Sequence, residues 1–110
     1  MSYQHSDLAA GRWKQFSFLE QMANIASEVE RALNWRAKNN GAYAERAFER
    51  ALELLDLSLA DAGSPSRRRE LARVREALVD FFCGSNTPAS TDASWRKYFS
   101  PFTYAARRTH

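Results

Sequence analysis

The sequence has little cysteine, glycine or proline, and it contains no long apolar run. Its one cysteine, Cys83, excludes an internal disulfide and a thiolate zinc cluster. Four glycines and three prolines are too few for the many turns of a β sandwich or barrel. No apolar stretch approaches the roughly 20 residues of a membrane-spanning helix, and the first residues lack the apolar segment of a signal peptide. We therefore expect a soluble, cytoplasmic protein.

The composition is that of one globular domain. Hydrophobic residues make up 45% of the 110 residues and charged residues 26%, close to the average of folded domains. A chain of this length buries roughly 60–70% of its unfolded surface, which suffices for a core without disulfides or metals. The net charge is +3, and the basic excess lies in residues 61–110, with nine Lys or Arg and five Asp or Glu. This balance permits an acidic or nucleic-acid partner without requiring one.

Four segments have the period of an amphipathic helix. They span about 18–39, 42–60, 65–82 and 91–106. Ser17 and Glu20 have the spacing of a capping box before the first segment. Ser64 and Pro65 suit the N-cap and first helical position of the third. Pro101 lies inside the last segment and predicts a kink or a split there.

Short turns join these segments, which predicts an all-α fold, an antiparallel up-and-down four-helix bundle with a kinked last helix. Residues 17–110 would form this single domain, and residues 1–16 a mobile or loosely docked N-terminal arm. We expect Trp13 and Phe16 to attach the end of the arm to the bundle. Leu55 lies on the wide apolar face of the second helix and is expected in the core.

Acidic residues at helical spacing suggest a metal site that the rest of the sequence does not support. Glu45, Glu49 and Glu53 recur every four residues. A di-iron bundle also needs Glu-x-x-His motifs, and the only histidines are His5 and His110. We interpret the glutamates as an exposed, ion-paired face, and we expect no metal and no cofactor.

Nucleophilic catalysis is also poorly supported. Cys83 has no internal histidine to act as its base, so we interpret it as a buried or half-buried structural thiol. The sequence has no glycine-rich phosphate loop. No catalytic residue is therefore assigned.

Two groups of polar residues are candidates for binding. Glu28, Arg31 and Trp35 lie at steps of three and four residues beside the apolar stripe of the first helix. They either line a groove for a ligand or partner, or form an ion pair with Trp35 packed over the core. In the third helix, Arg73 and Arg75 belong to an arginine-rich stretch that is able to contact phosphates. Its arginines point around the helix and acidic residues dilute its charge, so nucleic-acid binding is the weaker interpretation.

The C-terminal segment is rich in aromatic residues. Trp95, Phe99 and Phe102 recur at steps of four and three, and Tyr98 and Tyr104 lie close to them in sequence. One helix face is not expected to bury all these rings, so the arm or a second chain would cover some of them. The sequence thus predicts a homodimer whose interface includes Trp95, Phe99 and Phe102.

Several motifs resemble those of known small helical proteins. They are Glu20-Gln21-x-x-Asn24, Ser27-Glu28-Val29, the run from Ala47 to Asp56, Arg73-x-Arg75-Glu76, and Tyr98-Phe99 followed by Ala105-Ala106-Arg107. Through them, nearly all of residues 17–108 is similar to a family of small, uncharacterised all-helical proteins of bacteria and archaea. The resemblance implies an all-helical domain.

The chain also resembles, more weakly, the HEPN class of helical bundles, which are often dimeric and partnered with small nucleotidyltransferases. Ribonucleases of that class carry Arg, four to six residues, then His on a late helix. Here Arg107 and Arg108 precede His110 at shorter spacings, so the resemblance does not extend to that motif.

These observations favour a non-enzymatic interaction module that binds a protein or nucleic-acid partner and no membrane. The alternative is a degenerate HEPN-like ribonuclease, or another small enzyme that uses a groove around Glu28 and Arg31.

Overall fold

Four α-helices account for most of the computed structural model, which describes residues 11–108. A short 3-10 helix, η1 (Arg12–Gln15), precedes them. The helices are α2 (Phe18–Ala37), α3 (Gly41–Asp61), α4 (Pro65–Cys83) and α5 (Asp92–Arg108). The described residues contain no strand, and no helix among them is long and apolar enough to cross a membrane. The predicted all-α fold with four helices is confirmed.

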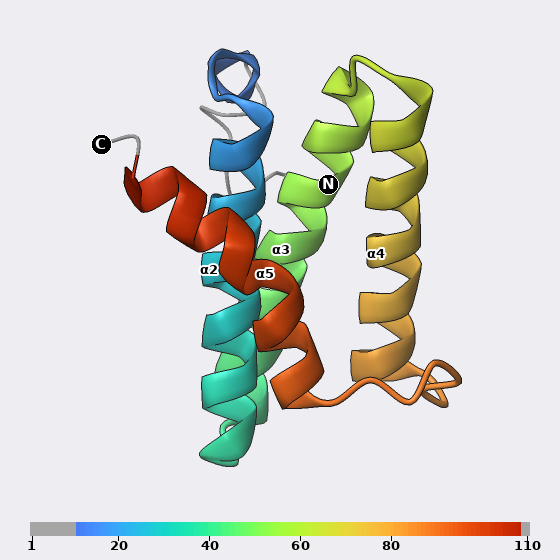
Figure 1. Ribbon diagram of the computed structural model, residues 1–110. Helices are drawn as coiled ribbons and strands as arrows, with labels where there is room; N and C mark the ends of the chain where they lie inside the picture. Colours follow the sequence, from blue (N-terminus) through green and yellow to red (C-terminus); the bar gives the residue numbers. More distant parts are fainter. Residues whose placement is uncertain (1–10, 109–110) are drawn as a thin grey trace.

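The helices are arranged around α2 and α3. Consecutive helices α2, α3 and α4 run in alternating directions, and α5 crosses the face of α2 obliquely (Figure 1). The most extensive packing joins α2 to α3 and α2 to α5, whereas α4 packs mainly on α3. The up-and-down bundle is therefore confirmed, with α5 inclined across α2 rather than aligned with it.

The helix ends follow the local signals in the sequence. Ser17 Oγ accepts a hydrogen bond from the Glu20 amide at 3.1 Å, and Glu20 Oε1 accepts one from the Ser17 amide at 2.9 Å. This reciprocal pair is the predicted capping box. Ser64 Oγ accepts from the Arg67 amide at 3.2 Å, with Pro65 as the first helical residue. Both predicted helix starts are confirmed.

Helix α5 continues through Pro101 without a break, so the predicted split is absent. Proline has no amide hydrogen, which leaves the helix one backbone hydrogen bond short at this position. The ribbon of α5 turns in its middle (Figure 1), in agreement with the predicted kink.

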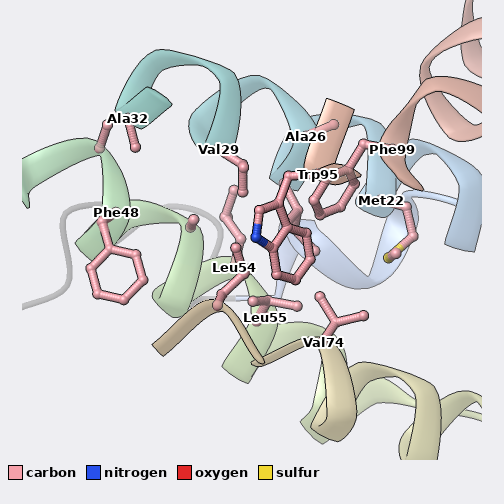
Figure 2. Close-up of a cluster of buried hydrophobic side chains, with 14 of the residues drawn as sticks. Met22, Ala26, Val29, Ala32, Phe48, Leu54, Leu55, Val74, Trp95 and Phe99 are labelled. Carbon is pink, nitrogen blue, oxygen red and sulfur yellow. The ribbon is translucent and has the colours of Figure 1, made fainter. Parts of the chain in front are cut away.

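Apolar residues of all four helices and of η1 meet in one core. Leu55 of α3 is fully buried, and Trp95 of α5 is 6% exposed. Figure 2 shows the indole of Trp95 directed inward among Val29 of α2, Leu54 and Leu55 of α3, and Val74 of α4. A single ring from α5 thus fills the space where the other three helices meet.

The chain before α2 is attached to the bundle by η1. Trp13 is buried, and its indole Nε1 donates to Ser58 Oγ of α3 at 2.9 Å. Its carbonyl accepts from Gln21 Nε2 at 3.1 Å, and its ring meets the Phe16 ring edge-on at 5.5 Å. The predicted attachment through Trp13 and Phe16 is confirmed, while the rest of the predicted arm, residues 1–10, lies outside the described residues.

Candidate functional site

A groove of about 670 Å³ lies between α2 and α5. Its floor consists of apolar residues that are buried in the core, and its walls are polar. The wall residues are Ser27, Glu30 and Arg31 of α2 and Arg96, Ser100, Thr103, Tyr104 and Arg107 of α5. We take this α2/α5 groove as the candidate site because it combines a closed apolar floor with charged and hydroxyl-bearing walls.

The α5 wall arises from helical spacing. Arg96, Ser100 and Tyr104 recur every four residues, and such residues share one face of a helix. This face adjoins the stripe of Trp95 and Phe99, which is buried against α2. Packing of the aromatic stripe onto α2 therefore places the polar stripe at the edge of the contact, where it faces the groove.

An ion pair connects the two walls of the α2/α5 groove. Arg96 Nε lies 3.0 Å from Glu30 Oε2, and Arg96 Nη2 donates to Asn34 Oδ1 at 3.2 Å. Further along α5, Tyr104 is 63% exposed, and the Arg108 guanidinium carbon lies 5.8 Å from its ring centroid. The groove thus has one end bridged by charges and one end with an exposed ring beside basic side chains.

The carboxylate of Glu28 is held by two arginines. Its Oε1 lies 3.2 Å from Arg31 Nη1, and its Oε2 lies 3.2 Å from Arg50 Nε of α3. Glu28 is buried and does not line the α2/α5 groove. Arg50 is not among the residues predicted from the sequence, although its place between Ala47 and Leu54 on the buried side of α3 is a usable signal.

Trp35 lies apart from this cluster. Its ring meets the Tyr43 ring edge-on, with the two ring centroids 4.8 Å apart. Lys38 Nζ lies 5.3 Å from the centroid of the Trp35 ring. Of the three residues predicted on the first helix, the structure joins Glu28 and Arg31 in an ion pair and brings only Arg31 to the groove. Glu28 therefore forms the structural ion pair that was the alternative to a ligand groove. Trp35 packs on Tyr43, where the C-terminal end of α2 meets the start of α3.

Removing Arg50 should destabilise the fold. In Arg50→Ala, one oxygen of a buried carboxylate loses its charged partner, and we expect the free energy of unfolding to fall by about 1–3 kcal/mol. Arg46→Ala is the control, because Arg46 is exposed on the same helix and such changes usually fall within about 0.5 kcal/mol. Denaturant titration compares the two. Equal effects in both variants would contradict a structural role for the Glu28–Arg50 pair.

The predicted basic residues of α4 pair with neighbouring carboxylates. Arg73 pairs with Glu70 one turn earlier, and Arg75 Nε lies 2.7 Å from Asp56 Oδ1 of α3. Neither arginine lines the α2/α5 groove. Their charge is therefore largely balanced locally.

The aromatic residues predicted as an interface lie mostly inside the chain. Trp95 and Phe99 are buried in the core, and Phe102 is partly buried with its ring edge-on to Phe18 at 6.2 Å. The expected surplus of ring area is therefore much smaller than the sequence suggested, because the inclined α5 brings its rings against several elements. Tyr104 is the ring of this segment that is mainly exposed.

Tyr98 occupies an unusual environment at the contact between α5 and α4. Its hydroxyl is buried without a hydrogen bond of regular geometry among the described residues. The pKa of Tyr98 lies above its usual value. Burial of the phenol is the largest cause, and the negative charge of nearby Glu70 raises the pKa further. The phenol therefore stays neutral at all physiological pH values.

The interpretation of Cys83 as a buried or half-buried thiol is wrong, because this residue is exposed. It is the last residue of α4, where the chain leaves the bundle. Glu45 and Glu49 are exposed as predicted, whereas Glu53 is partly buried, so the prediction of an exposed Glu53 is wrong. Within residues 11–108, no three His, Cys, Asp or Glu side chains lie close enough together to hold a metal ion. His5 and His110 lie outside the described residues.

Comparison with family models, curated proteins and solved structures finds no match to this chain.

Proposed function

We propose that the protein is a non-enzymatic interaction module and that the α2/α5 groove is its binding surface. The carrying observation is the groove itself, whose walls present arginines, hydroxyls and the exposed ring of Tyr104 above a closed floor. Tyrosine and arginine are among the residues that contribute most to binding energy at protein interfaces. The groove volume also falls in the usual range for binding sites.

The geometry favours binding over catalysis. An enzyme built on Glu28 and Arg31 would need a carboxylate that reaches a substrate. Both Glu28 oxygens are engaged by arginines, and the side chain does not line the groove. The groove walls hold hydroxyls, arginines and one carboxylate, Glu30, which is paired with Arg96, and they hold no His, Cys or Lys.

A selection experiment tests this function. A phage-displayed library of random peptides is selected on the folded protein, and the enriched peptides are measured against Ser100→Trp and Ala60→Trp. Ser100 lines the groove, whereas Ala60 is exposed on α3 away from it, so the two variants differ in where they add the same bulk. We expect Ser100→Trp to abolish binding and Ala60→Trp to preserve it. Absence of enriched binders, or equal loss in both variants, would refute the proposal.

A homodimer, as predicted from the aromatic content, remains a prediction within this proposal, as does a cytoplasmic location. Burial of Trp95 and Phe99 leaves Phe102 as the residue of the predicted interface that is only partly buried. Light scattering at tens of micromolar is expected to give twice the monomer mass. A monomer in the unmodified protein would contradict the dimer.

A further inference from the structure

Charge is unevenly distributed along the α2/α5 groove. At one end, Arg96 is paired with Glu30 and Arg31 with Glu28. At the other end, Arg107 lines the groove and Arg108 lies beside it over the Tyr104 ring. Both are exposed and form no ion pair with a carboxylate within the described part of the chain. This second end therefore presents uncompensated positive charge beside the exposed ring of Tyr104.

The floor of the groove limits the kinds of partner that it can bind. Val29, Leu33 and Phe99 are at most 4% exposed, so the floor offers little apolar surface for a partner to cover. An amphipathic helix that binds through apolar anchors needs such surface. Recognition must therefore come from the walls, through charge pairing, hydroxyl hydrogen bonds and contact with the Tyr104 ring.

The walls fit a protein segment better than a nucleic acid. Nucleic-acid interfaces are strongly and continuously basic, since every phosphate needs a favourable environment. Here the groove wall includes the Glu30 carboxylate, which pairs with Arg96. A mixed-charge groove with exposed tyrosine and arginine at one end is typical of protein interfaces.

We infer that the α2/α5 groove binds an acidic segment of another protein, whose carboxylates pair with Arg107 and Arg108 while a neighbouring side chain packs on Tyr104. This inference rests on the proposed function. The distance from Arg96 to Arg107 along α5 is about 16 Å, so an extended peptide of about ten residues is long enough to follow the whole groove.

Fluorescence anisotropy with labelled probes tests the inference. The probes are three peptides of about ten residues that share one Ser, Ala and Tyr framework and carry Glu, Gln or Lys at the same positions, and a single-stranded thymidine oligonucleotide of similar length. The acidic peptide should bind tightest at low salt, because salt screens exposed charge pairs. In R107E/R108E, its affinity should fall roughly tenfold and the Lys peptide should gain affinity. Circular dichroism verifies that α5 stays helical.

The matched control is R68E/R69E, which makes the same change of charge at exposed arginines of α4 outside the groove. It should change the affinity for the acidic peptide less than about twofold. Equal losses in both variants, or tighter binding of the oligonucleotide with the same dependence on Arg107 and Arg108, would overturn the inference. If groove-dependent binders from the peptide library are not acidic, the inference fails and the proposed function stands. If no peptide depends on the groove, both fail.

Discussion

Replacing Trp95 with alanine is expected to lower the free energy of unfolding by about 3–5 kcal/mol, the usual cost of removing a large buried aromatic ring. The indole is 6% exposed and fills the space where α2, α3 and α4 meet (Figure 2). Its ring also stacks on the Phe99 ring, with the centroids 6.1 Å apart, and its centroid lies 6.3 Å from that of the Phe81 ring. Its loss leaves a cavity that three separate helices would have to move to close.

The indole nitrogen of Trp95 has no hydrogen-bond partner among the described residues. Trp95→Phe therefore sacrifices no hydrogen bond and removes a buried unsatisfied donor, so we expect it to retain most of the stability lost in Trp95→Ala. Tyr104→Ala, on the exposed face of the same helix, is the control and should cost less than about 0.5 kcal/mol. Denaturant titration followed by circular dichroism measures all three. A cost below about 1 kcal/mol for Trp95→Ala would show that the ring is not part of the core.

We expect the second large effect from Leu55→Ala, at about 2–5 kcal/mol. Leu55 is fully buried on α3, the helix that contacts both α2 and α4. Leu55→Met keeps the volume and should cost less than about 1.5 kcal/mol. Leu19→Ala provides the surface comparison, because Leu19 is 39% exposed. If the Leu55 and Leu19 variants unfold at the same denaturant concentration, the assignment of this α3 face to the core is incorrect.

The elements of the fold could be predicted because their signals are local. Ser17 with Glu20, and Ser64 with Pro65, set the starts of α2 and α4 by contacts between residues three positions apart or fewer. The apolar stripes that define the core, including Leu55, follow from helical periodicity. None of these features depends on how the helices pack against one another.

The α2/α5 groove could not be predicted, since it depends on how α5 crosses α2. Arg96 and Glu30 are 66 positions apart and meet only after the helices have packed. The surplus of aromatic area was overestimated for the same reason, because the burial of Trp95 and the contact of Phe102 with Phe18 depend on how α5 packs. The burial of Cys83 was predicted wrongly because the exposure of the last residue of a helix depends more on the path of the following loop than on the helical pattern.

Pro101 divides α5 into two parts with different roles. Trp95 and Phe99 anchor the part before it in the core, whereas Tyr104 and Arg107 belong to the part after it. The missing backbone hydrogen bond makes Pro101 a natural hinge. The part after Pro101 is held less extensively, through buried Ala106 and the contact of Phe102 with Phe18, so amide hydrogens after Pro101 are expected to exchange with solvent faster than those of the part before it. Local opening of α5 is then expected to begin at the end of the groove that carries Tyr104 and Arg107.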